Sequence, residues 1–177
     1  MKPSYEFVIR PALAGDVDML QQLSIITFSD TYRQYNTEED MQLYIAQHFG
    51  REILLNELNS KENFFFLAML NDEPAGYIKL RTSHELSQLK NKNSIELERI
   101  YVVKHLQGTG LGSRLIQYGV DFAQSKGYDI IWLGVWTKNE KAINFYKKCG
   151  FEIFGEHEFI LGKDEQIDWL MKKVLRS

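Results

Sequence analysis

The residues with the clearest chemical potential lie in a glycine-containing segment at residues 104–114. Gly108, Gly110 and Gly112 follow a stretch rich in β-branched and aromatic residues, 94–103, and precede apolar residues at helical spacing. A loop between the end of a strand and the start of a helix offers unbonded backbone N–H groups and the positive end of the helix dipole. The segment therefore predicts an anion site, most often one for a phosphate.

The glycine spacing disfavours two common phosphate loops and matches a third. A nucleoside triphosphate loop ends in Gly-Lys-Ser/Thr, whereas this loop ends in Gly-Leu-Gly-Ser-Arg at residues 110–114. The dinucleotide fingerprint requires a glycine three positions after Gly110, where the chain has Ser113. The remaining pattern, Gln107-x-x-Gly110-x-Gly112, resembles the loop with which GCN5-related N-acetyltransferases (GNAT family) bind the pyrophosphate of acetyl-CoA.

A second motif follows at the distance that this family would have. Residues 139–151 contain Asn139, then Tyr146 after six residues, then Gly150 and Phe151. This is similar to the Asn-x6-Tyr-x3-Gly-Phe pattern of the same family. The stretches 97–102, 132–140 and 21–31 look closer still to the PaiA-type bacterial spermidine/spermine (polyamine) N-acetyltransferases.

The resemblance implies a set of contacts to acetyl-CoA. The backbone of 100–102 would pair with the pantetheine amides, the loop would hold the pyrophosphate, and two residues further along would add contacts; these residues are Ile100, Tyr101, Val102, Gln107, Gly108, Thr109, Gly110, Leu111, Gly112, Ser113, Asn139 and Lys148. Alternatives stay open at four positions. Leu111 also suits the helix core, Arg114 and Lys148 a solvated face, and Asn139 a helix N-cap.

Acetyl transfer to an amine needs a neutral amine and a proton for the departing thiolate, but no enzyme nucleophile. Tyr146 is the candidate acid, because a phenol with a pKa of about 10 can protonate a sulfur of similar basicity; the alternative is a core tyrosine. Glu98 is the favoured base or amine anchor, with Glu96 second. A regular strand would place both glutamates on the face of Ile100 and Val102, although Arg99 interrupts the apolar face and indicates a β-bulge. Either glutamate could instead be a paired surface charge.

The acceptor pocket of this family is walled by the first two helices. Here that region is acidic and aromatic, with Asp30, Tyr32, Tyr35, Glu38, Glu39 and Asp40. Such residues suit a polyamine through ion pairs and cation–π contacts, but acidic residues also favour any helix start. The four histidines share no metal-ligand spacing, and Cys149 suits packing, so no metal is expected.

Length and composition indicate a single domain over residues 1–177 of a globular protein. The net charge of −3 argues against a nucleic-acid partner, and a lone cysteine excludes an internal disulfide. Because no leader-like or 18-residue uncharged stretch occurs, we expect a cytoplasmic protein with no membrane contact, as a monomer or homodimer.

Periodicity and turn signals predict the elements that must position these residues. Strands are expected at 5–10, 64–70, 75–82, 94–103, 130–136, 151–159 and 166–174, the last two joined through Gly162. Helices are expected at about 16–32, 37–49, 51–58, 111–127 and 139–149. This order predicts an α/β fold of the GNAT type, with a mixed, twisted sheet of about seven strands and helices on both faces.

The sequence thus predicts an acetyl-CoA-dependent N-acetyltransferase that acts on a primary amine, with a polyamine such as spermidine or spermine favoured. Acetylation of a protein N-terminus or of another small amine, such as an aminoglycoside, is the second possibility. A CoA-binding regulatory module without turnover is the third, and intact Tyr146 and Glu98 speak against it.

Overall fold

The computed structural model describes residues 5–161 and 163–175. These residues form one seven-stranded mixed sheet in the order β1-β2-β3-β4-β5-β7-β6. Its strands are β1 Val8–Pro11, β2 Asn63–Leu70, β3 Glu73–Arg81, β4 Ser94–Val102, β5 Ile130–Trp136, β6 Glu152–Leu161 and β7 Asp164–Val174. The predicted α/β class and strand number are therefore confirmed, while Gly162, expected to join the last two strands, lies outside the described residues.

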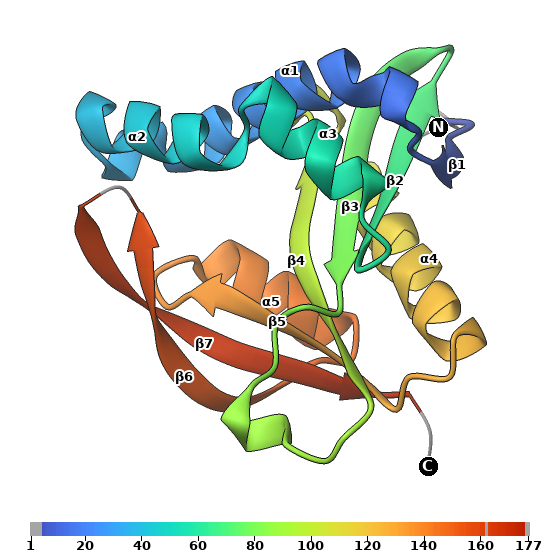
Figure 1. The fold of residues 1–177 in the computed structure, drawn as a ribbon, viewed down its shortest axis with the longest axis vertical. Helices are drawn as coiled ribbons and strands as arrows, with labels where there is room; N and C mark the ends of the chain where they lie inside the picture. The colour runs from blue at the N-terminus through green and yellow to red at the C-terminus, as the bar shows by residue number, and fades with distance from the viewer. Residues whose placement is uncertain (1–4, 162, 176–177) are drawn as a thin grey trace.

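Helices cover both faces of this sheet (Figure 1). Three of them, α1, α2 and α3, lie together across the top of the view, and α4 packs against the other face of β3 and β4. Their bounds are α1 Val17–Tyr32, α2 Glu38–His48, α3 Arg51–Asn59, α4 Leu111–Ser125 and α5 Glu140–Lys148, with short 3-10 turns at Ala14–Asp16, Arg33–Tyr35, Ser87–Leu89 and Lys104–Leu106.

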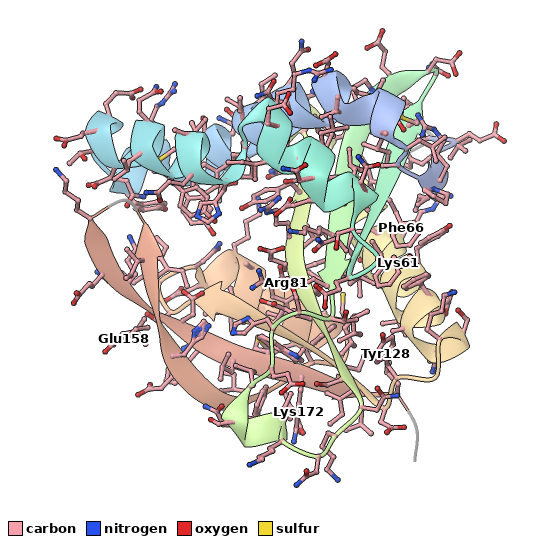
Figure 2. All side chains as sticks on the ribbon, in the orientation of Figure 1. Lys61, Phe66, Arg81, Tyr128, Glu158 and Lys172 are labelled. Carbon is pink, nitrogen blue, oxygen red and sulfur yellow. The ribbon has the colours of Figure 1, made fainter. Side chains whose placement is uncertain are left out.

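Each helical layer has its own apolar core. On the α4 side, Phe66 of β2 packs against Tyr118 and Phe122 of α4, and Figure 2 shows Phe66 beside that helix. The opposite side buries Leu20 and Leu54 of the upper helices against the sheet. The buried apolar surface on both faces holds β2, β3 and β4 as a rigid platform.

Strand β4 carries the bulge that Arg99 indicated. Lys79 of β3 pairs with Arg99 and the next residue, Leu80, pairs with Leu97, so Glu98 is the extra residue on β4. The bulge changes which residues share a face. Ile100 and Val102 pack toward the α4 core, as Ile95 and Leu97 do, and the expectation that Ile100 and Val102 share a face with Glu96 was wrong.

Strands β4 and β5 are parallel neighbours over only three residues. Ser94, Ile95 and Glu96 pair with Ile130, Ile131 and Trp132, and beyond this point the two strands diverge (Figure 1). The rest of β4, from Leu97 to Val102, pairs with β3 on one side only. Its other edge therefore presents unpaired backbone N–H and C=O groups to the gap between the strands.

Candidate active site

The diverging strands enclose a cleft of about 830 Å³. Its walls come from the end of α1 and the turn that follows, from β4 and β5, from the glycine loop and from α5. Eleven of the fourteen residues predicted for the site line it: Glu98, Ile100, Tyr101, Val102, Gln107, Gly108, Gly110, Gly112, Ser113, Asn139 and Tyr146.

The glycine loop forms the mouth of the cleft. Gly108 and Gly110 adopt φ values of 81° and 93°, in the left-handed region that disfavours other residues. The Arg114 N–H, which donates to the Gly110 carbonyl at 3.1 Å, makes the first bond of the α4 turn, so the N–H groups of 111–113 precede the helical ladder. A Cβ on Gly112 would lie 3.2 Å from the Phe145 ring of α5. The N–H groups of 111–113 and the dipole of α4 together make this part of the cleft suitable for a phosphate.

Three lysines that the sequence analysis did not single out also line the cleft. They are Lys104, Lys138 and Lys141, and Lys141 Nζ donates to Gln107 Oε1 at 3.0 Å. Lys148, which the motif suggested for a phosphate contact, is exposed and is not among the lining residues. The overlooked signal was proximity along the chain, because Lys138 and Lys141 flank Asn139 where α5 starts beside the loop.

The other predicted loop and helix residues have local structural partners. Thr109 Oγ1 donates to the Leu106 carbonyl at 2.7 Å, and Leu111 is buried in the α4 core. Arg114 donates to the Phe7 carbonyl at 2.9 Å and so holds the segment before β1. Asn139 caps α5, since its Oδ1 accepts from the Ala142 N–H at 3.1 Å, and it also lines the cleft.

Tyr146 is placed by α5 at the side of the cleft. Its ring contacts Phe145 and Phe151, with centroid separations of 5.4 and 5.9 Å, and its hydroxyl has no hydrogen-bond partner among the described residues. Burial raises the pKa of Tyr146 above its usual value, and the phenol of Tyr32 and the thiol of Cys149 add to the rise. The hydroxyl therefore stays protonated at neutral pH and can donate to a group in the cleft.

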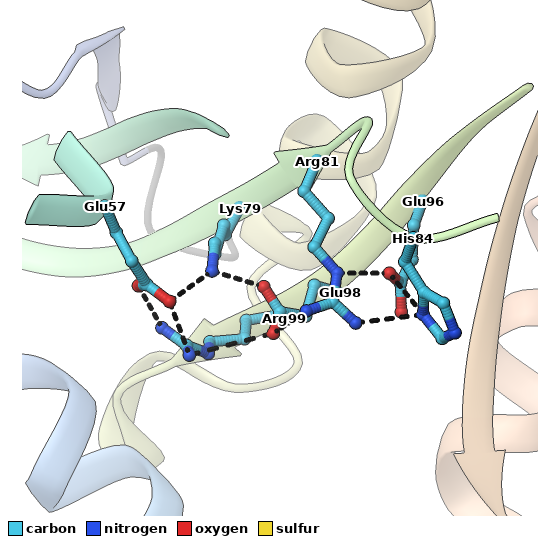
Figure 3. Close-up of polar contacts among 7 residues, drawn as sticks. All are labelled: Glu57, Lys79, Arg81, His84, Glu96, Glu98 and Arg99. Atoms are coloured by element: carbon cyan, nitrogen blue, oxygen red, sulfur yellow. Dashed lines mark hydrogen bonds and ion pairs between the residues drawn. The ribbon is translucent and has the colours of Figure 1, made fainter. Parts of the chain in front are cut away.

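Glu98 lies within a buried network of ions (Figure 3). Its carboxylate contacts Lys79 and pairs with Arg81 at 2.9 Å and with Arg99 at 3.8 Å. Glu57 of α3 completes the group, because it accepts from Lys79 at 2.7 Å and from Arg99 at 3.1 Å. Lys79 and Arg99 have almost no exposed side-chain surface, so these charges need one another.

The network determines the proton affinity of Glu98. Burial alone would raise the pKa of Glu98, but the positive charges of Arg99, Lys79 and Arg81 outweigh burial and lower the pKa to about 2. A carboxylate with so low a pKa is a weak proton acceptor. This argues against the prediction that Glu98 removes a proton from the amine and favours the alternative of a paired charge, although the paired carboxylate is largely buried rather than at the surface.

Glu96, the second predicted base, belongs to the same network. Its carboxylate accepts from Arg81, and His84 Nδ1 lies 3.1 Å from it. With Glu96 and Glu57 added to Glu98, three carboxylates face the three cations Lys79, Arg81 and Arg99. The pairing leaves no glutamate of β4 free of a cationic partner.

The acidic residues of the predicted acceptor region fall into two groups. Asp30, Tyr32 and Tyr35 line the cleft. The acidic residues at the start of α2 are exposed and engaged elsewhere, with Glu38 near Arg33 at 3.6 Å, Glu39 bonded to Lys163 Nζ at 2.7 Å and Asp40 bonded to the Lys163 N–H at 2.8 Å. These bonds tie α2 to the β6–β7 hairpin across the cleft.

Two absences among the described residues bear on the class of site. No group of three or more histidine, cysteine, aspartate or glutamate side chains lies close enough to hold a metal ion within 5–161 and 163–175. Over the same residues, no helix has the length and apolar character needed to cross a membrane.

Comparison with known proteins gives a consistent match. The model of the acetyltransferase (GNAT) family matches residues 21–151. The chain is 37% identical over 149 residues to an uncharacterized N-acetyltransferase in the pepI 3′ region of Lactobacillus delbrueckii subsp. lactis, covering 84% of this chain and 86% of the relative. It is 27% identical over 157 residues to an N-alpha-acetyltransferase of Sulfurisphaera tokodaii, covering 85% and 83%.

A solved structure shares the fold over nearly the whole chain. This is the PaiA N-acetyltransferase of Thermoplasma acidophilum in complex with coenzyme A, with a TM-score of 0.79 and 22% sequence identity. The match covers 96% of this chain and 99% of that one.

Proposed function

The chain belongs to the acetyltransferase (GNAT) family and is an N-acetyltransferase that uses acetyl-CoA, and we propose that its acceptor is the primary amine of a polyamine such as spermidine or spermine. The observation that carries this proposal is the cleft itself. Its donor end combines a strand edge without a partner strand and an anion loop, while its acceptor end combines the Asp30 carboxylate with aromatic rings.

The donor end fits acetyl-CoA residue by residue. The edge of 100–102 that faces away from β3 has no partner strand and offers backbone groups of the kind that the pantetheine amides need, although the Val102 carbonyl accepts from Gln107 Nε2 at 3.3 Å. The N–H groups at the start of α4, with Lys138 and Lys141 beside them, suit the phosphates. When bound, acetyl-CoA supplies the activated acetyl thioester.

Tyr146 is the side chain that would meet the departing sulfur. Its hydroxyl keeps its proton and has no partner within the described protein, so it can donate to the charge that develops on a thiolate. Enclosing the sulfur in this cleft would raise the pKa of the thiol as well, so the proton affinity of the sulfur would rise along with that of the phenol.

Glu98 has a different task in this proposal. Because it is ionised over the whole functional pH range, it balances Lys79 and Arg81 and holds the bulge of β4. That bulge sets the direction of the free strand edge, so Glu98 acts as an electrostatic anchor of the donor site.

At the acceptor end, the lining groups match an amine with several positive charges. The Asp30 carboxylate offers an ion pair, and Tyr35 and Trp136 meet edge to face with centroids 5.0 Å apart. Aromatic faces beside carboxylates stabilise alkylammonium groups. The second candidate acceptor is a protein N-terminus, and it is favoured by the likeness to the N-alpha-acetyltransferase of Sulfurisphaera tokodaii.

An acceptor panel tests the choice. Purified protein is assayed with acetyl-CoA and with spermidine, spermine, an aminoglycoside and a set of short peptides with free N-termini, and the released thiol and the product mass are measured. The proposal expects the highest kcat/KM with spermidine or spermine. Acetylation of peptides together with no activity on polyamines would reject the polyamine and select the protein N-terminus.

A further inference from the structure

We propose that Asp168 of β7 is the catalytic base, a role that rests on the proposed function: its carboxylate accepts the proton that the acceptor amine loses. Asp168 lies on the strand next to β5, where its backbone pairs with Trp136 of that strand and with His157 of β6. It is thus on the acceptor side of the cleft, across the divergence from Glu98.

The position of Asp168 combines burial with a missing partner. The residue is 7% exposed, and its Oδ1 atom is buried without any hydrogen-bond partner among the described residues. A buried carboxylate without a partner is costly and rare. Such a group is expected where a ligand or a transferred proton completes its bonding.

Gly134 opens a path from the cleft to this carboxylate. It is the exposed residue in the otherwise buried strand β5, and it lines the cleft. A Cβ at this position would lie 3.1 Å from Asp168 Oδ2 and 3.3 Å from His157 Nε2. Asp168 is not itself among the residues that line the cleft, and Gly134, which has no side chain, is the lining residue that lies between Oδ2 and the cleft.

The electrostatic surroundings of Asp168 give its carboxylate a proton affinity suited to a catalytic base. Burial raises the pKa of Asp168 to about 7, and no cation among the described residues offsets this rise. The ionisable groups that face it are His157 of β6, Tyr32 of α1 and Tyr44 of α2. Burial lowers the pKa of His157, aided by His84, and burial raises the pKa of Tyr44 to about 12, so all three are uncharged near pH 7.

The proton balance of the reaction requires such a group. An ammonium carries three protons on nitrogen and the amide product carries one, so two protons leave. Asp168 takes one and passes it to solvent. The nitrogen lone pair then forms the N–C bond, the C–S bond breaks, and the second proton ends on the sulfur by way of the Tyr146 hydroxyl.

The test is the pH dependence of kcat/KM for spermidine in the wild type and in Asp168→Asn. The wild type is expected to rise through an apparent pKa near 7 and then level off, because its base is ionised. The variant is expected to lose at least about 100-fold at pH 7 and to keep rising with unit slope toward pH 10, because only neutral amine reacts.

His157→Gln is the matched control, since it alters the other ionisable group beside Gly134 and keeps Asp168. In this variant, kcat/KM should still rise through an apparent pKa near 7. The affinity for CoA, measured by calorimetry, should stay within about twofold in both variants, and Asp168→Ala serves as the second variant where Asp168→Asn does not fold.

Three results would overturn the inference. The limb near pH 7 could persist in Asp168→Asn, it could vanish in His157→Gln instead, or the loss in Asp168→Asn could be equal at every pH. These outcomes concern Asp168 alone, because they require a wild type that acetylates amines. Absence of wild-type activity on every amine would instead reject the proposed function, and this inference with it.

Discussion

Two carboxylates lie on opposite sides of the divergence between β4 and β5, and their surroundings differ completely. Glu98 of β4 contacts three cations, and its pKa falls to about 2. Asp168 of β7 has a buried oxygen with no hydrogen-bond partner in the described part of the chain, and its pKa rises to about 7. Environments that push two pKa values apart assign different tasks to chemically similar groups.

A position in a sequence motif therefore does not decide which carboxylate can carry a proton. Glu98 lines the cleft next to the donor edge, yet its partners keep it ionised at all functional pH values. Asp168 lies on β7, two strands away from the donor edge of β4, and its lack of partners among the described residues lets it gain and lose a proton near pH 7. The paired group stabilises the fold, while the unpaired group costs stability and can serve chemistry.

The largest loss of stability is expected for Glu98→Gln. Removing this charge leaves Lys79, which is almost fully buried, with Glu57 as its remaining partner, and should lower the free energy of unfolding at pH 7 by on the order of 3 kcal/mol. Urea unfolding measures this loss. Glu158→Gln, an exposed glutamate on β6, is the matched control and should change stability by less than about 0.5 kcal/mol.

The pH dependence of that loss follows from the lowered pKa. A carboxylate whose folded pKa lies below its unfolded pKa stabilises the protein above the unfolded value, and this contribution disappears as the pH falls toward the folded value. The difference between wild type and Glu98→Gln should therefore shrink from about pH 5 toward pH 2. A loss that is independent of pH would contradict the pairing of Glu98 with its cations.

An effect of opposite sign and similar size is expected for Asp168→Asn. The folded pKa of Asp168 lies above its unfolded value, so the charge costs stability fully above about pH 7 and costs nothing below about pH 4. The variant should be more stable than the wild type by about 2–4 kcal/mol at pH 8 and about equal at pH 4. Chemical denaturation at the two pH values checks this, and destabilisation at pH 8 would show that the carboxylate has a partner.

Tyr146→Phe should give the smallest change in free energy, a fall in kcat of about 10- to 100-fold. The phenol would act on the sulfur and Asp168 on the amine, so the rising limb near pH 7 should remain while the rate falls. Steady-state rates across pH measure both features. Disappearance of that limb in Tyr146→Phe would transfer the titration from Asp168 to the phenol.

Much of the donor side could be predicted from the sequence, because it rests on local chemistry. A glycine loop, a helix start and an Asn cap are properties of short segments, so the start of α4 after Gly110 and the cap of α5 at Asn139 could be predicted. The bulge was also visible, since a charged residue, Arg99, broke an apolar alternation. The position of Lys148 could not be predicted in this way, because the direction in which a helical lysine points depends on how α5 packs against the rest of the protein.

The acceptor side depends on contacts between distant residues. Glu98 meets Lys79 and Glu57, which come from β3 and α3, so no local pattern reveals that its charge is balanced. The sequence indicated the burial of Asp168 only weakly, through its alternation with Ile167. In the structure Ile167 is exposed, and Asp168 shares the buried face with Gln166 and Leu170. That its buried oxygen lacks a partner follows only from the packing of β5, β6 and β7.

The contrast between the two carboxylates can be measured directly by NMR titration of side-chain carboxyl carbons. Protein labelled with ¹³C at these positions is followed from pH 3 to pH 9, and Asp168→Asn and Glu98→Gln assign the two resonances. We expect a titration midpoint near pH 7 for Asp168, and we expect Glu98 to remain largely ionised down to pH 3. A midpoint for Asp168 near 4, as for an exposed aspartate, would contradict it.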